Sequence, residues 1–127
     1  MAKRTSINIP GMAHGAPIPM GCKVGNTVYS SAISGRDVDR NVMPEDPDEQ
    51  AVNMFKNLRT FMECAGGTPE DIVHLRFLTK DEKYRENMNK EWLKMFPDEH
   101  SRPARHALTT EVRGSLFAIE IVAVLDH

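Results

Sequence analysis

A single charged residue, Glu120, interrupts an otherwise apolar run from Leu116 to Leu125. Burying an unpaired carboxylate there would cost on the order of several kcal/mol, so Glu120 must be paired or reached by water. A carboxyl group in an apolar strand is also suited to shuttling protons. Glu120 is therefore a candidate for chemistry, and Arg105, in the β-rich run before it, is a cation long enough to reach it.

The placement of Arg105 relative to Glu120 depends on how their two runs pair. Arg113-Gly114-Ser115 separates them and predicts a hairpin. If the turn consists of the two residues Arg113 and Gly114, residue 107 faces Glu120, and Arg105 lies one diagonal away on the same face of the sheet. A slip of one residue would move Arg105 to the other face. Taken alone, the pattern favours a structural ion pair over a catalytic site.

Two amphipathic helices are expected to pack on these strands. Asp46 as N-cap and Pro47 at the first position predict where one begins, and Gly66-Gly67 predict where it ends. Between these limits, apolar residues recur every three or four positions, as in a helix with one buried face. A similar pattern predicts a second helix from Asp81 to Phe96, in which Trp92 is expected to be part of the core.

Shorter β-rich runs complete the expected fold. Residues 18–24 and 27–33 predict a hairpin, and residues 1–17 an irregular arm with a short strand near 6–9. Residues 72–78 predict a strand with Val73, Leu75 and Phe77 facing inward. The expected class is α+β, in the order β-β-α-β-α-β-β, with a mostly antiparallel sheet and both helices on one face. Because two helices cannot cover both faces, another copy in a closed ring is expected on the open face.

Length and composition exclude several kinds of protein. We expect one domain over residues 1–127, with no membrane span and no secretory signal, and hence a cytoplasmic location. Cys22 and Cys64 form no CxxC pair, and the five histidines lack metal-ligand spacing, so no metal is expected. A net charge of -2 with scattered basic residues argues against nucleic acid as the main partner.

Several short segments together resemble the Rid family, also called YjgF-like or L-PSP-like. They fall in the family's order and spacing over about residues 18–125, and the most specific are Pro103-Ala104-Arg105 and Ile119-Glu120-Ile121. The other segments are Gly25-Asn26, Ser30-Ser31, Glu49-Gln50, Asn57-Leu58, Gly66-Gly67, Asp71-Ile72-Val73, Asn89 and Phe96.

This resemblance implies a homotrimer of chorismate-mutase-like subunits with clefts between neighbours. It implies an enamine/imine deaminase that hydrolyses 2-imino acids, such as 2-aminoacrylate-like acids, to 2-keto acids and ammonia without any cofactor. Arg105 would bind the substrate carboxylate through its planar fork. Backbone groups near Ser31 and Ala32 would help to hold the substrate, and Glu120 would orient or deprotonate the attacking water.

The sequence departs from the family pattern around this expected pocket. Ala107 stands where the archetypal deaminases have a cysteine, and Pro17 and Ile18 stand where a tyrosine is expected. Ser31-Ala32 replaces Ser-Gly, and Ile33 replaces the following glutamine. The pocket has therefore lost polar groups, and a divergent substrate is expected. Cys22 and His14 are the candidates to supply replacement polar groups, although each residue type is more often structural.

Two other functions remain open from the sequence. One is a non-catalytic trimeric module that binds small carboxylates through Arg105. The other is deamination or tautomerisation of a catabolic, aminomuconate-like acid. The acidic balance opposes ribonuclease activity as the main function.

Overall fold

The computed structural model of the chain describes residues 3–12 and 14–126, so residues 1, 2, 13 and 127 of the expected domain lie outside the described residues. One mixed sheet carries the fold, with strand order β1-β2-β3-β7-β5-β6 and with β4 also paired to β7. Every pair is antiparallel except β5 with β6. The strands are β1 Thr5–Ile7, β2 Gly21–Val24, β3 Thr27–Ser30, β4 Ile33–Ser34, β5 Ile72–Thr79, β6 Ala104–Thr109 and β7 Phe117–Val124.

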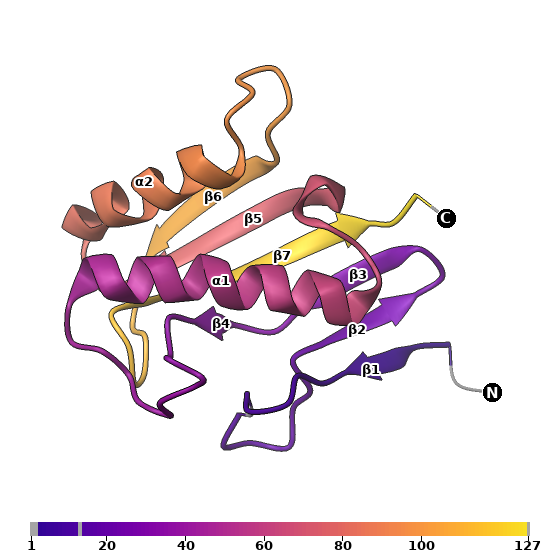
Figure 1. Ribbon diagram of the computed structural model, residues 1–127, viewed down its shortest axis with the longest axis horizontal. Helices are drawn as coiled ribbons and strands as arrows, with labels where there is room; N and C mark the ends of the chain where they lie inside the picture. The colour runs from indigo at the N-terminus through magenta and orange to yellow at the C-terminus, as the bar shows by residue number, and fades with distance from the viewer. Residues whose placement is uncertain (1–2, 13, 127) are drawn as a thin grey trace.

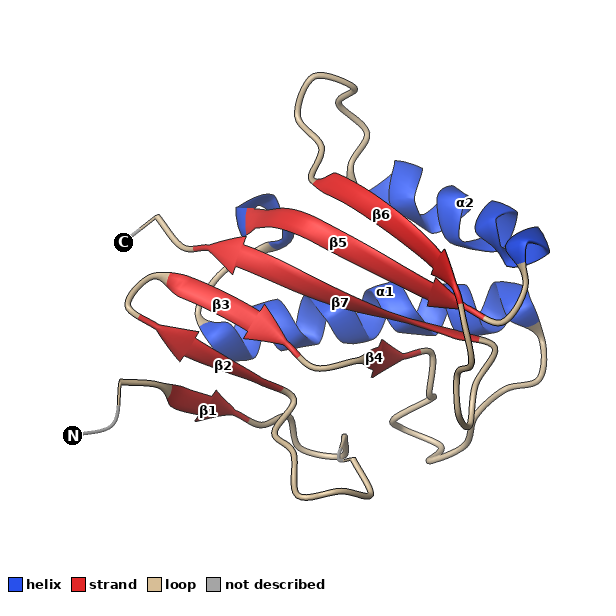
Figure 2. Cartoon of the chain, turned by 180° about the vertical axis from the view of Figure 1, so that it is seen from behind, coloured by secondary structure: helices blue, strands red, loops and turns tan. Residues whose placement is uncertain are grey.

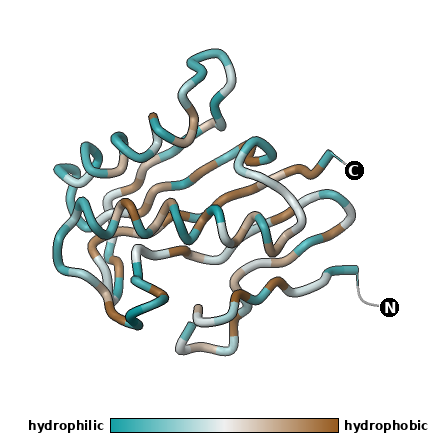
Figure 3. Tube along the Cα trace, in the orientation of Figure 1, coloured by the Kyte–Doolittle hydropathy of each residue, from teal (hydrophilic) through white to brown (hydrophobic). Residues whose placement is uncertain are grey.

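Two helices, α1 (Pro47–Ala65) and α2 (Arg85–Met95), cover one face of this sheet, and the view from behind shows the other face bare (Figures 1 and 2). The predicted limits of α1 are confirmed: Asp46 accepts a hydrogen bond from the backbone N of Glu49 at 2.9 Å, and Gly66 ends the helix at φ 88°. Hydrophobic and hydrophilic residues alternate along α1, and most of β7 is hydrophobic (Figure 3). The α+β class and the one-sided helical layer therefore follow the prediction.

The N-terminal strands also follow the prediction, over shorter spans. β2 and β3 form the expected hairpin across Gly25-Asn26. The arm is less irregular than expected, because β1 pairs with β2 and extends the sheet by one edge strand. Among the described residues, no helix is long and apolar enough to cross a membrane.

The predicted hairpin between the last two strands is wrong. β6 pairs with β5 in parallel, β7 pairs with β5 antiparallel, and β5 therefore lies between them. The segment after β6 instead bridges over the end of β5, where Thr110 donates to Thr79 O and Lys80 donates to Leu116 O. The physical reason is the crossover through α2, which returns the chain beside β5 in the same direction.

Val73 was predicted to face inward, and this is also wrong. A bulge between Ile72 and His74 shifts the register of β5 against β7. The extra residue breaks the two-residue alternation, so Ile72 and Leu75 are both buried while Val73 is 47% exposed.

Buried amide side chains fix the loop after β4 against α1. Asn57 donates to the carbonyl oxygens of Ser34 and Arg36 at 2.9 Å each. Gln50 donates to Pro44 O and accepts from Leu116 N, so it ties the loop to the start of β7. A Cβ on Gly35 would lie 2.0 Å from Gln50 O, so only glycine allows this close approach. These contacts give a structural reason for the amide side chains of Gln50 and Asn57, which are part of the family-like segments.

Candidate functional site

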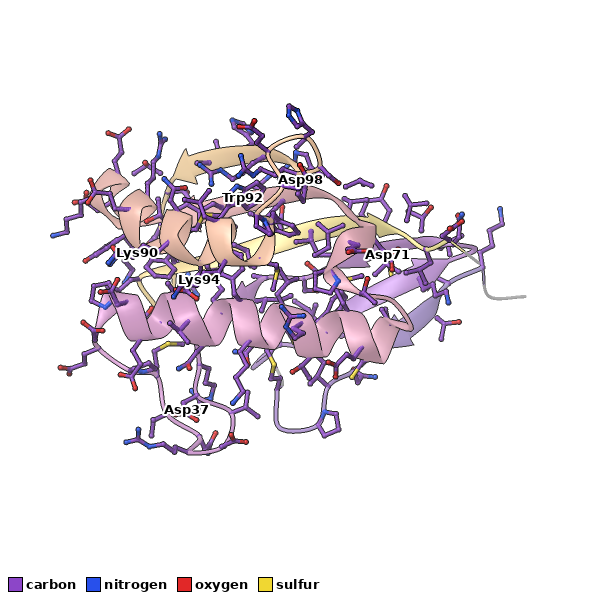
Figure 4. The ribbon with its side chains drawn as sticks, turned by 45° about the horizontal axis from the view of Figure 1, so that its top comes forward. Asp37, Asp71, Lys90, Trp92, Lys94 and Asp98 are labelled. Carbon is purple, nitrogen blue, oxygen red and sulfur yellow. The ribbon has the colours of Figure 1, made fainter. Side chains whose placement is uncertain are left out.

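Arg105 lies on β6, at the edge of the sheet, and its side chain turns toward α2. Nη1 donates to Asn89 Oδ1 at 2.7 Å and lies 3.4 Å from Met88 Sδ. The guanidinium also lies 4.9 Å from the centre of the Trp92 ring, which is a cation–π arrangement. Figure 4 shows Trp92 on the side of α2 away from Lys90 and Lys94, which face α1. The sheet edge and α2 together hold the guanidinium in one place.

The surroundings of Arg105 are positive and partly dehydrated. Burial lowers the pKa of Arg105 below its ordinary value, and the nearby charge of Arg85 lowers this pKa further. None of the ion pairs among the described residues involves Arg105. Its Nε and Nη2 donate to no described residue, so two donors of the planar fork are available to an anion.

Glu120 lies on the open face of the sheet, in the middle of β7. Its Oε1 accepts from Arg76 Nη1 at 2.9 Å, and both side chains are partly exposed to solvent. Beside this ion pair the face has a hollow of about 340 Å³. It is lined by Tyr29, Ser30, His74, Arg76, Glu120, Ile121 and Val122. A partly solvated carboxylate beside a hollow has room for a water molecule.

Arg105 and Glu120 do not share a face within one chain, which corrects the hairpin-based prediction. Arg105 pairs in register with Leu75, whose side chain is buried under the helices. Glu120 pairs with the next residue of β5, Arg76, on the opposite face. Two strand spacings, about 10 Å, also separate β6 from β7. The physical reason is again that β5 lies between the two strands.

Three of the remaining expected site residues, Ala107, Ser31 and Ala32, divide between these two regions. Ala107 lies with Arg105, two residues along β6 and beside Phe77. Ser31 and Ala32 lie at the break between β3 and β4, which borders β7 near Glu120. Both donors of Ser31 are already used: Oγ donates to Pro19 O at 2.8 Å and the backbone N to Met20 O at 2.7 Å.

Ile18, expected at the substrate, and the two candidate replacement groups, His14 and Cys22, are not gathered around Arg105. Ile18 is 52% exposed and, together with His14, lines a hollow of about 400 Å³ beside the N-terminal arm. The Nε2 of His14 is buried there without a hydrogen-bond partner among the described residues. Cys22 lies on β2 and pairs with Tyr29. No group of three His, Cys, Asp or Glu residues with metal-binding geometry occurs within 3–12 and 14–126.

Three contact residues were not predicted from the sequence. Asn89 was expected only as part of the family-like pattern, and it contacts Arg105. Trp92 was expected only in the core; it is buried as expected, and it also supports Arg105. Arg76 was missed altogether. Its signal was an arginine in an apolar strand, which matches the lone acid in the neighbouring apolar strand.

Comparison with known proteins now extends these observations. The family model described as Endoribonuclease L-PSP matches residues 16–125. A RutC family protein of Aquifex aeolicus is 30% identical over 118 residues, which cover 86% of this chain and 93% of the relative. The crystal structure of RidA from an Antarctic Psychrobacter is 27% identical, with a TM-score of 0.85, covering 95% of this chain and 99% of that chain.

The chain belongs to the Rid family. The resemblance drawn from the Pro-Ala-Arg and Ile-Glu-Ile segments is thus confirmed. A further Rid structure, the YjgF gene product of E. coli, has the same fold at 23% identity, with a TM-score of 0.82 and coverage of 94% of this chain and 98% of that one. Within the Rid fold, the edge of β6 and the open face carry the two candidate groups.

Proposed function

We propose that this Rid protein is an enamine/imine deaminase that hydrolyses 2-imino acids to 2-keto acids and ammonia in the cytoplasm. The observation that carries the proposal is the state of Arg105. It is a partly dehydrated guanidinium, positioned by Asn89 and Trp92, that has no carboxylate partner among the described residues and has two free donors. Such a group is preorganised for the carboxylate of a small acid, because its orientation is fixed before the ligand binds.

We further propose that copies of the chain assemble into a chorismate-mutase-like homotrimer whose sites lie in the clefts between neighbours. The open face supports this proposal, because it exposes four large apolar side chains: Val24, Tyr29, Leu108 and Val124. Exposed apolar patches of this kind mark contact surfaces. The separation of Arg105 from Glu120 within one chain also supports the trimer. In a closed ring, Glu120 of one copy could meet Arg105 of the neighbouring copy.

In the proposed reaction, Arg105 binds the substrate carboxylate and orients the adjacent imine carbon. Glu120 of the neighbouring copy accepts a proton from a water molecule as the water oxygen bonds to that carbon. Glu120 then returns this proton to the nitrogen to give a carbinolamine. The nitrogen takes the hydroxyl proton as the C–N bond breaks, so ammonia leaves and the carbon retains the oxygen as a ketone. No step requires an oxidant, a reductant or a further cofactor.

Two observations favour a second candidate function. Glu120 is already paired with Arg76, and Ala107 provides no polar side chain beside Arg105. A trimeric module that binds small carboxylates without turnover would need Arg105 to hold the ligand, but it would not need Glu120 as a free base. Ribonuclease activity, which the name of the family model suggests, is disfavoured by the net charge of -2.

The test is ammonia release from imino acids generated in situ by an amino acid oxidase. We expect the wild-type chain to accelerate release, and Arg105→Ala and Glu120→Gln each to remove most of the acceleration. An Arg105→Lys variant keeps the charge without the planar fork, so its rate of ammonia release should lie between those of wild type and Arg105→Ala. Binding of 2-keto acids through Arg105 without any turnover would contradict the deaminase and support the binding module.

A further inference from the structure

A second arginine, Arg85, begins α2 on the side that meets Arg105. It precedes Asn89 by one helical turn, so the two side chains lie on the same face, about 6 Å apart along the axis. Asn89 is the residue that accepts from Arg105 Nη1. The positive charge of Arg85 also acts on Arg105 strongly enough to lower its pKa, second only to burial. Arg85 therefore lies on the side of α2 that carries the Arg105 contact, near enough for its charge to act on Arg105.

Arg85 has little to neutralise it within the chain. Its carboxylate neighbour is Glu82, at 4.0 Å between Arg85 Nη2 and Glu82 Oε1, with side chains that are 47% and 75% exposed. An exposed pair at this distance contributes little, because water and salt screen it. Two adjacent cations without a strong acidic partner repel each other, and an anion bound between them would relieve that repulsion.

We propose that Arg85 binds a second, distal carboxylate of the substrate, so that the preferred substrates are dicarboxylic 2-imino acids. Arg105 takes the carboxylate next to the imine carbon, and Arg85 takes the carboxylate at the other end of a short aliphatic chain. This inference rests on the proposed function, because it assigns the first carboxylate to Arg105. It adds a residue that determines specificity and that acts by contact with the substrate rather than in the reaction itself.

The experiment measures binding of two stable 2-keto acids to the full chain by titration calorimetry. 2-Oxoglutarate carries the distal carboxylate, and 2-oxopentanoate has the same number of carbons without it. We expect wild type to bind 2-oxoglutarate about ten-fold more tightly, as for one charge-assisted contact. Arg85→Gln should bring the two Kd values within about two-fold of each other, and it should weaken 2-oxoglutarate much more than 2-oxopentanoate, because only 2-oxoglutarate loses a direct contact.

Lys94→Gln is the matched control, because it removes one positive charge from α2 on the side facing α1 (Figure 4). We expect this variant to keep the wild-type preference. Equal binding of the two acids by wild type would overturn the inference, as would an equal loss of both in Arg85→Gln or a lost preference in Lys94→Gln.

Failure of the proposed function gives a different result. Arg85-dependent binding of 2-oxoglutarate without ammonia release from any imino acid would contradict the deaminase and keep the distal site. Release from monocarboxylic imino acids without any preference for 2-oxoglutarate would keep the deaminase and remove the distal site. If Arg105→Ala bound both keto acids as wild type does, both claims would fall.

Discussion

The ion pair between Arg76 and Glu120 is partly solvated, with side chains 45% and 34% exposed. Pairs of this kind contribute little to stability, because water screens the charges and two long side chains lose conformational freedom. We therefore expect Glu120→Gln and Arg76→Met each to change the free energy of unfolding by less than about 1 kcal/mol. Urea denaturation measures this directly.

Measuring both activity and stability of Glu120→Gln separates its role in catalysis from its role in stability. Glu120→Gln should remove most of the ammonia release while the protein remains folded, because the amide cannot accept the proton from water. If Glu120→Gln instead lost several kcal/mol of stability, Glu120 would be a structural residue and its proposed role would fail.

Sequence reasoning could identify Arg105 and Glu120 individually but not their true neighbours. Glu120 stood out because its type did not fit the apolar run around it, which is a local property. Arg105 stood out as a cation long enough to reach Glu120 and through the Pro103-Ala104-Arg105 segment. The partner of Glu120 is Arg76, 44 residues earlier in the chain, and the partner of Arg105 is Asn89, on a helix. Both contacts depend on strand order and register, which a single strand does not encode.

The loop after β4 is fixed to α1 by the side chain of Asn57, which is 5% exposed and donates to two carbonyl oxygens. Asn57→Leu leaves both oxygens without this donor at little change in volume. Each unsatisfied group costs about 1–3 kcal/mol, so we expect a loss of about 2–6 kcal/mol in the free energy of unfolding. Thermal and urea denaturation would both report it.

Asn53→Leu provides the matched control on the same helix. Asn53 donates a single bond, at 3.2 Å, to Gly35 O, and it is only partly buried. Its loss should stay below about 1 kcal/mol, since water can replace the donor. Equal losses in the two variants would mean that helix propensity, and not the buried amide, determines the effect.

The helices could be predicted more fully than the strand pairing. The caps and apolar stripe of α1 lie in one continuous segment, so the sequence carries nearly all the information that its limits require. The predicted β6–β7 hairpin was wrong because β5 lies between these two strands. A short glycine-containing segment between two β-rich runs looks the same in the sequence whether the runs pair with each other or with a third strand between them. The bulge at Val73 is likewise a property of the β5–β7 pair.

At the scale of the whole molecule, the bare sheet face is the surface that assembly would cover. We propose that this face lies in contact between copies, and Val124 is an exposed apolar residue on it. Val124→Asp should weaken the trimer, because the charge would lose its water on assembly. Val52→Asp, at a similarly exposed apolar position on α1, should leave assembly unchanged. Sedimentation velocity over a range of protein concentrations distinguishes the two results, and equal effects would place the contact elsewhere.

The most direct test of a site shared between copies mixes two inactive variants. Arg105→Ala lacks the carboxylate ligand and Glu120→Gln lacks the base, so each trimer alone should release almost no ammonia. In a trimer with equal random mixing, a cleft receives an intact Arg105 from one copy and an intact Glu120 from the next in roughly one quarter of cases. We therefore predict recovery of roughly one quarter of wild-type activity after co-refolding. No recovery, with mixed trimers demonstrated, would contradict the shared site.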